Sequence, residues 1–169
     1  GVDIHTHNKF VANALKDQGI ENVELHTTEG NNLPVDDKSI DFIYSFIVFI
    51  HLSSPKILET YLSESYRVLK PGGIASFYYG RPYSYRTKKS KNKFIRTAYS
   101  IIEAIAEIAI LDFFGNGYRY NPDVPANSVS LMVTRKKIRQ LTKKAGFNIE
   151  SQQSNPNWSQ GFIVLQKPF

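Results

Sequence analysis

The sequence predicts an α/β fold built on a largely parallel sheet, and two observations carry that prediction. Segments with the period of a strand alternate along the chain with segments that have the period of a helix. An apolar run at residues 40–52 shows no alternation, which is typical of a parallel strand buried on both faces. The order strand, helix, strand, strand, helix, strand indicates crossover units within one sheet.

The first part of the chain supplies a short strand, a helix and a second strand. Residues 1–4 have the pattern of a strand end that presents an acidic side chain. A helix is expected at residues 6–18, because its apolar residues share one face and Gly19 follows as a stop. A further short strand is expected at residues 22–27.

The remaining elements follow the apolar run. A helix is expected at residues 55–69, with a proline in its first turn and Pro71-Gly72-Gly73 after its end, and a strand at residues 74–79. A helix at residues 134–145 and two antiparallel strands, at residues 147–151 and 162–166, complete the chain.

Composition limits the architecture and the chemistry. The chain has 169 residues, of which 41% are hydrophobic, so we expect a single domain over residues 1–169. The absence of cysteine excludes a disulfide framework and a thiolate nucleophile, and it fits a cytoplasmic location. The sequence shows no secretion signal.

Positive charge is concentrated in two short segments. The net charge is +6, yet residues 81–96 alone carry seven cations and no acid. A second basic cluster lies at residues 135–144. We expect solvated faces at both, and a specific anion or nucleic-acid site remains the alternative.

The acid at position 3 is the first functional signal. In dinucleotide-type α/β folds the acid that binds the ribose hydroxyls follows a glycine-rich phosphate loop by about 20 residues. No such loop precedes Asp3, so we expect the other half of a nucleotide site upstream of Gly1.

Several short segments in sequence order carry a family resemblance. The segments are Gly1-Val2-Asp3-Ile4, Asn22-Val23-Glu24-Leu25, Asn32-Leu33-Pro34-Val35, Ser39-Ile40-Asp41-Phe42 and Arg67-Val68-Leu69-Lys70-Pro71-Gly72-Gly73. With them the chain resembles the class I S-adenosylmethionine-dependent methyltransferases, most of all their UbiE-like and type 11 members, over residues 1–80 and 133–167. The resemblance implies a three-layer αβα Rossmann-like sheet of order 3-2-1-4-5-7-6 whose last strand is antiparallel. It also implies S-adenosylmethionine as cofactor, with S-adenosylhomocysteine as product.

By this resemblance, four positions would bind the ribose and the adenine. Asp3, beside Ile4, matches the acid that accepts hydrogen bonds from both ribose hydroxyls, a task for which a carboxylate is suited because it only accepts. Glu29 matches the acid that reaches the adenine amino group, although the family usually has Asp there, and Gly30 matches the backbone that meets the ring.

Two further positions match the methionine side of the family's site. Ser45 and Phe46 fall at the end of the fourth family strand, beside the methionine portion of the cofactor. Residues 67–73 are expected to be structural and to bind no ligand.

The family's first strand and its glycine-rich turn have no counterpart in this sequence. Gly115-Asn116-Gly117 is expected to be a loop. Because the missing strand is central, the sheet must leave a gap, pair its second strand with its fourth, or borrow a strand. We therefore expect a rearranged assembly or a homodimer.

His51 is the best acid or base on the substrate side, with a helix-capping or solvated histidine as the alternative. The pair His5 and His7 lacks a third ligand, so no metal is expected.

Residues 81–130 are expected to form a lid over the acceptor, as an insertion after the fifth family strand. Arg81, Tyr83 and Tyr85 could stack on or neutralise a flat or anionic acceptor, or could serve only as lid packing. The apolar segment at residues 94–114 carries one polar stripe, so we expect a buried lid or dimer helix in place of a membrane span.

The sequence thus predicts methyl transfer from S-adenosylmethionine to a small molecule that is aromatic, lipid or quinone-like. One alternative is a truncated scaffold or binding domain without catalysis. Another is a methyltransferase that uses residues 81–96 to contact RNA, which we consider unlikely, or a membrane surface.

Overall fold

A four-stranded sheet forms the centre of the computed structural model. Its strand order is β3 (Ile40–Ser45), β4 (Leu69–Gly80), β8 (Gln160–Gln166) and β7 (Asn148–Ser154). β3 and β4 are parallel, whereas β8 runs antiparallel to both β4 and β7. The structure describes residues 1–30, 32–82, 92–106, 111–121, 123, 128, 130–154 and 160–169.

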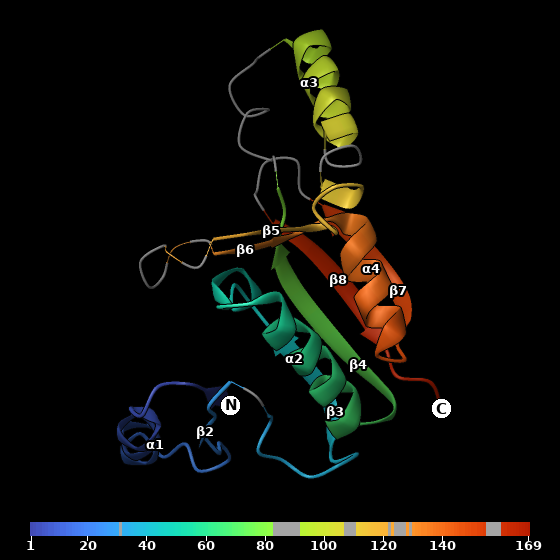
Figure 1. Cartoon of the computed structure of the whole chain (residues 1–169). Coiled ribbons are helices and arrows are strands. Elements are labelled where there is room, and N and C mark those ends of the chain that lie inside the picture. The colour runs from blue at the N-terminus through green and yellow to red at the C-terminus, as the bar shows by residue number, and fades with distance from the viewer. Residues whose placement is uncertain are drawn as a thin grey trace.

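Two helices cover one face of this sheet (Figure 1). α2 (Pro55–Val68) contributes Leu58 and Leu62 to the core, and α4 (Arg135–Lys144) contributes Ile138 and Leu141. Both helices begin at a capping hydroxyl that accepts a backbone hydrogen bond, Ser54 for α2 and Thr134 for α4. The facing strands supply the alternating residues Ala75, Phe77 and Tyr79 of β4 and Ile163 and Leu165 of β8.

The opposite face of β3 is exposed, which corrects the expectation of a strand buried on both faces. Phe42 is 57% exposed and Tyr44 is 56% exposed. The strand ends at Ser45, and the rest of the apolar run turns into a short 3-10 helix, η1 (Phe49–His51). The reason is that α2 and α4 lie on the same side of the sheet and leave its other side open.

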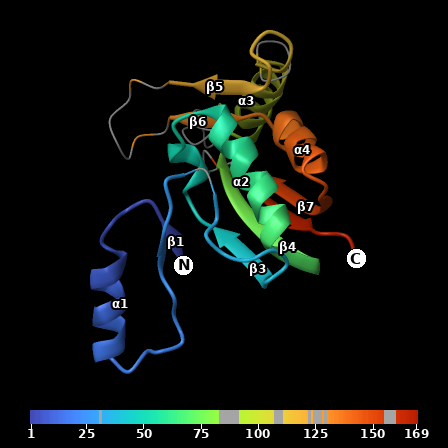
Figure 2. The ribbon, with the colours of Figure 1, turned by 60° about the horizontal axis from the view of Figure 1, so that its bottom comes forward.

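A second, two-stranded sheet stands apart from the first (Figure 2). β1 (Val2–Asp3) and β2 (His26–Thr27) are parallel and are joined through α1 (Asn8–Asp17). Within each sheet the neighbouring strands agree with the expected family order, and in the part of the chain that the structure describes no strand pairs with both β1 and β3. The described part of the chain therefore does not pair β1 with β3, whereas a strand borrowed from another copy stays a prediction.

One face of α2 holds the segment that connects the two sheets. Glu64 accepts the Leu33 amide at 2.9 Å. Arg67 donates to the Leu33 carbonyl at 2.8 Å, to the Val35 carbonyl at 3.0 Å and to Asp37 at 2.6 Å. Arg67, the first of the family-like residues at 67–73, thus holds this connecting segment against α2.

The segment after β4 forms an arm beyond the sheet layer (Figure 1). It contains α3 (Lys93–Ala106) and the antiparallel pair β5 (Tyr118–Tyr120) and β6 (Leu131–Val133). Gly115-Asn116-Gly117 is a turn, with φ of 51° at Asn116 and 79° at Gly117. The described apolar side chains of α3 are exposed, so the helix is not a buried lid in this chain. No helix among the described residues is long and apolar enough to cross a membrane.

Candidate cofactor site

Asp3 lies at the carboxyl end of β1, where parallel strands present ligand-binding groups. Its carboxylate is exposed and accepts one hydrogen bond from a described residue, the His5 amide at 2.9 Å. Its backbone carbonyl accepts the Thr28 amide at 3.0 Å, which ties it to the end of β2. The carboxylate therefore retains acceptor capacity for two hydroxyl groups of a ligand.

The turn after β2 is organised by the buried hydroxyl of Thr28. That hydroxyl donates to the Asn32 carbonyl at 2.6 Å and accepts the Gly30 amide at 3.2 Å. Gly30 is buried and has φ of 86°, a left-handed conformation that favours glycine. Glu29, between them, points into solvent as an exposed residue. The turn thus offers one exposed carboxylate beside a close-lying stretch of backbone.

Tyr61 of α2 brings this turn and Asp3 together. Burial, and after it the negative charge of Asp3, raises the pKa of Tyr61, while a hydrogen bond with Thr28 opposes the rise. A Cβ built on Gly30 would lie 3.8 Å from the Tyr61 hydroxyl. Asp3, Thr28, Gly30 and Tyr61 therefore form one cluster.

Tyr61 and Thr28 were not predicted from the sequence as site residues. Tyr61 lies among the apolar residues of its helix, and nothing in its local pattern indicates a ligand. The signal that could have found Thr28 is a hydroxyl followed by Gly30 two residues later, a pattern of side-chain-stabilised turns.

Ser45 and Phe46 mark the carboxyl end of β3. Ser45 is half-buried and pairs with Phe77 of β4, while Phe46 is 44% exposed. The next residue, Ile47, has φ of 66°, which is an outlier for a β-branched side chain. Such strain is concentrated at functional turns. No hydrogen bond between described residues joins this strand end to β1, so the two predicted halves of the site stand on separate sheets.

An aromatic cluster continues from this strand end across the open face of the sheet. Phe46 meets Tyr78 edge to face at 4.9 Å between ring centroids, and Tyr78 lies 4.7 Å from Phe162. Tyr44 stacks with Phe46 at 6.4 Å. These rings form an apolar surface beside Ser45.

His51 ends η1 and does not cap a helix. Its Nδ1 lies 2.9 Å from the Ser128 carbonyl oxygen, and α2 is capped by Ser54 instead. Because a carbonyl only accepts, Nδ1 carries the proton in this bond, and Nε2 of the neutral ring is left as an acceptor. His51 therefore does not cap α2, its exposed ring is consistent with the alternative of a solvated histidine, and its role on the substrate side stays a prediction.

Arg81 follows the carboxyl end of β4 and is half-buried. Gln160 lies beside it, since its backbone pairs with Gly80, and its buried Oε1 has no hydrogen-bond partner among the described residues. Sequence reasoning missed Gln160, because nothing in its local pattern distinguishes it from a solvent-facing amide. Tyr83 and Tyr85 lie outside the described residues.

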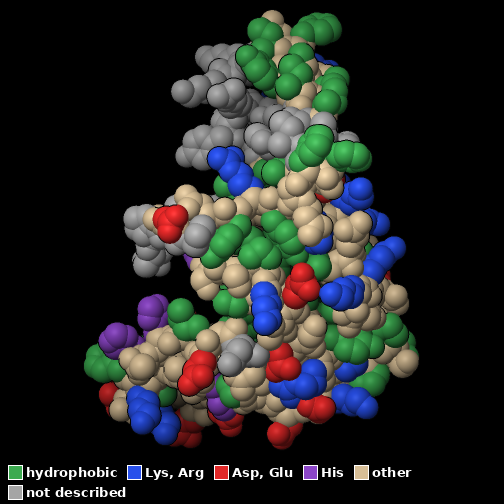
Figure 3. Space-filling model, viewed as in Figure 1, with side chains coloured by type: hydrophobic (Ala, Val, Ile, Leu, Met, Phe, Trp, Pro, Cys, Tyr) green, Lys and Arg blue, Asp and Glu red, His purple; other side chains and the backbone are tan. Residues whose placement is uncertain are grey.

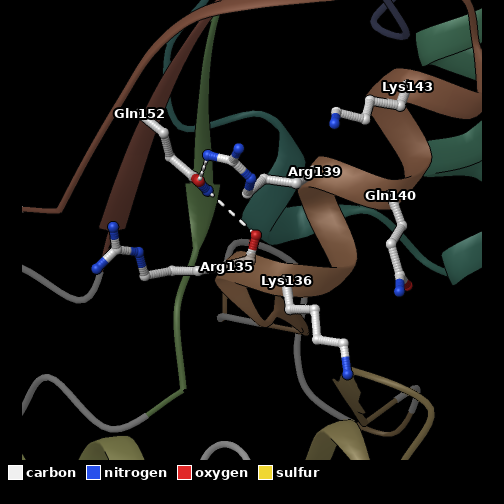
Figure 4. A pocket seen from close by; sticks show the side chains of 6 residues that line it. All are labelled: Arg135, Lys136, Arg139, Gln140, Lys143 and Gln152. Carbon is white, nitrogen blue, oxygen red and sulfur yellow. Dashed lines mark hydrogen bonds between the residues drawn. The ribbon is translucent and has the colours of Figure 1, made fainter.

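The second basic cluster lines a separate hollow (Figure 4). This cavity of about 410 Å³ lies along α4 and β7 and contains none of the predicted cofactor residues. The Gln152 side chain lies along this cavity. Its Oε1 accepts a hydrogen bond from Arg139 Nη1 at 3.4 Å, and its Nε2 donates to the Arg135 carbonyl at 3.3 Å. Its cations are exposed, as expected for a solvated face.

Among the described residues no group of three or more His, Asp or Glu could hold a metal ion.

Comparisons with known proteins agree with this fold. Residues 1–77 match a family model described as a methyltransferase domain, that of type 11. A SAM-dependent methyltransferase from Methanosarcina mazei superposes with a TM-score of 0.62 at 18% identity, covering 99% of this chain and 81% of that chain. A protein from Pyrococcus horikoshii gives 0.61 at 19% identity, covering 99% and 70%.

A third solved structure carries ligands. The 1,6-didemethyltoxoflavin-N1-methyltransferase of Burkholderia thailandensis, with 1,6-didemethyltoxoflavin and S-adenosylhomocysteine bound, gives 0.62 at 14% identity, covering 99% and 60%. No curated protein sequence matches the chain at a significant level.

The chain shares the Rossmann-like fold of the S-adenosylmethionine-dependent methyltransferases among these solved structures. Residues 1–77, slightly less than half of the chain, match the type 11 methyltransferase domain model. The matched family model describes a methyltransferase domain, and S-adenosylhomocysteine is bound in one of the solved structures.

Proposed function

We propose that this chain transfers a methyl group from S-adenosylmethionine to a small aromatic or otherwise apolar acceptor. The observation that carries the proposal is the cluster of Asp3, Thr28, Gly30 and Tyr61, where an exposed carboxylate lies beside a glycine turn at the ends of two parallel strands. Strand ends of this kind are where α/β sheets bind nucleotides.

The residues of this cluster fit the nucleoside part of the cofactor. Asp3 accepts hydrogen bonds from the ribose hydroxyls with the lone pairs that His5 leaves available. Glu29 accepts from the adenine amino group, and the Gly30 backbone faces the ring, since a glycine there leaves room for close approach. Ile4, which is 62% exposed, supplies apolar contact next to Asp3.

Ser45 and Phe46 border the other end of the site, where the cofactor's methionine portion would lie. When bound, the cofactor would supply a methyl group attached to a sulfonium sulfur. A nucleophile of the acceptor takes this methyl group by in-line displacement. The chain's part is to align the two partners, which can supply much of the rate acceleration. His51 Nε2 can take a proton from an acceptor hydroxyl or amine.

The aromatic cluster of Tyr44, Phe46 and Tyr78 supports an aromatic or apolar acceptor. Ring faces and edges bind flat apolar molecules through offset and edge-to-face contacts. Arg81 and the buried Gln160 amide lie at the same end of β4 and can orient a polar group of the acceptor. The rate at which S-adenosylhomocysteine is formed should therefore be higher with flat aromatic or quinone-like acceptors than with small polar amines.

Calorimetry with S-adenosylmethionine and S-adenosylhomocysteine tests the cofactor site directly. Asp3→Asn should weaken binding about 10-fold to 100-fold, because hydrogen bonds to a charged group contribute about 1.5–3 kcal/mol. Glu21→Gln removes the same charge from an exposed position of the same unit and should leave affinity unchanged.

Absence of heat with both ligands would contradict the proposal and favour a binding or scaffold domain. Equal losses in Asp3→Asn and Glu21→Gln would show that net charge, and not the ribose contact, determines affinity.

A further inference from the structure

α3 presents an apolar surface that nothing else in the described chain covers. Phe94 is 86% exposed, and Ile101, Ile102 and Ile105 are 54%, 60% and 60% exposed. Figure 3 shows hydrophobic side chains gathered along this helix at the end of the arm. A monomeric soluble protein rarely leaves such a patch exposed without a use for it.

The helix is divided cleanly into two faces. Apolar residues recur at the spacing of one helical face, whereas Lys93, Arg96 and Thr97 lie on the other. Both cations are exposed. The apolar face comprises Phe94, Ile95, Ala98, Ile101, Ile102 and Ile105.

The base of the arm also exposes apolar side chains, and it is held against the rest of the protein. Phe113 and Phe114 form an edge-to-face pair at 5.1 Å, and both are 81% exposed. Beside them Leu111 is buried, and the Thr134 hydroxyl donates to the Asp112 carboxylate at the start of α4. Exposed aromatic rings on a fixed base are suited to the boundary between water and hydrocarbon.

The charge pattern selects the partner. Residues 81–96 carry seven cations and no acid, and two of these cations, Lys93 and Arg96, lie on α3 itself. A second copy would carry the same excess of positive charge, with a net charge of +6, so two copies repel each other at long range. A surface of anionic lipid headgroups neutralises that charge while its acyl region accepts the apolar face.

We propose that α3, together with Phe113 and Phe114, docks the protein on an anionic lipid surface, with α3 lying in the plane of the interface. The inference goes beyond methyl transfer and does not depend on it. Docking would bring the protein to the lipid layer in which an apolar acceptor is dissolved.

Vesicle flotation with the whole chain tests the proposal. Vesicles of phosphatidylcholine containing phosphatidylserine should bind the protein, pure phosphatidylcholine vesicles should bind it weakly, and added salt should reduce binding. Ile102→Asn should weaken partitioning about tenfold or more, because the side chain no longer buries its apolar surface. Lys93→Gln with Arg96→Gln should weaken it by a similar factor of about ten on anionic vesicles.

The matched control is Thr97→Asn, which introduces the same residue on the polar face of the same helix and should bind as the parent does. Equal loss in both Asn variants, or equal binding to neutral and anionic vesicles, would overturn the proposal. So would a dimer in sedimentation velocity that Ile102→Asn abolishes without any vesicle binding, since the face would then belong to a second copy. Calorimetry with S-adenosylhomocysteine in the absence of vesicles separates failure of docking from failure of the cofactor site.

Discussion

At the scale of single residues, Asp3 and Tyr61 should be coupled electrostatically. Burial raises the pKa of Tyr61 first, and the Asp3 carboxylate raises it further because a phenolate beside a carboxylate is unfavourable. Asp3→Asn should therefore lower the pKa of Tyr61 toward its ordinary value. NMR titration of ring-labelled tyrosine, with Tyr61→Phe to assign the signal, measures the change, and an unchanged Tyr61 pKa would mean that Asp3 is not near the ring in solution.

Glu64 should make stability depend on acid pH. Hydrogen bonding to Arg67 is the main cause that lowers the pKa of Glu64, and the Leu33 amide adds to it. Since the folded pKa lies below the ordinary value of 4.5, this stabilisation is complete above about pH 4.5 and is lost as the pH falls through the folded pKa.

Urea unfolding at pH 7 and at pH 4 measures this effect. Glu64→Gln should cost about 1 kcal/mol at pH 7 and less at pH 4, since one charge-assisted interaction is removed. Glu150→Gln, an exposed carboxyl on β7, serves as the control. A penalty for Glu64→Gln that is equal at both pH values would rule out this linkage.

At the scale of elements, β8 approaches β4 closely enough that Gly161 has no room for a side chain. A Cβ on Gly161 would lie 2.3 Å from Cζ of Tyr79, which is fully buried and whose hydroxyl accepts the Gln152 amide at 2.8 Å. Gly161→Ala should therefore cost about 1–3 kcal/mol of unfolding free energy.

The clash can be isolated with a double-mutant cycle. In a Tyr79→Leu background the same Gly161→Ala change should cost much less, because the ring is gone. Additive costs in chemical denaturation would show that the penalty arises from the strand backbone and not from the ring.

At the scale of the whole molecule, the β1–β2 unit should open before the main sheet. α1 buries no residue, and β1 is exposed throughout, whereas Tyr79 of β4 and Leu165 of β8 are fully buried. Hydrogen exchange should give opening free energies at least about 2 kcal/mol lower in α1, β1 and β2 than in β4 and β8.

Cofactor should reduce this difference. Saturating S-adenosylhomocysteine should slow exchange in β1 and β2 more than in β7, because the ligand binds only the closed unit. Equal protection from exchange in both sheets without ligand would contradict the expected difference in opening free energy.

The open edges of β1 and β3 bear on association. Unpaired strand edges favour pairing with another chain, so the expected homodimer or strand-rearranged assembly stays a prediction. Sedimentation velocity over a range of protein concentrations measures it. A monomer at all concentrations would show that the gap is tolerated without a partner strand.

Local sequence signals account for most elements. The helices at 55–69 and 134–145 and the antiparallel pair at the end of the chain were predicted within a few residues, because caps, glycine stops and periodicity are short-range properties. The strand at 22–27 was largely wrong, since only His26 and Thr27 pair with β1. Strand identity there depends on a partner of just two residues.

The sequence by itself determined the class of fold and the acid at the end of β1, because each follows from patterns within a few neighbouring residues, whereas the strand order was implied by the family resemblance. Only the tertiary structure decided which surfaces are covered. It brought Tyr61 and Thr28 to Asp3, left Phe42 and the apolar face of α3 exposed, and separated Asp3 from Ser45 on different sheets. Burial and long-range contacts depend on segments that are distant in sequence, so no local sequence pattern predicts them.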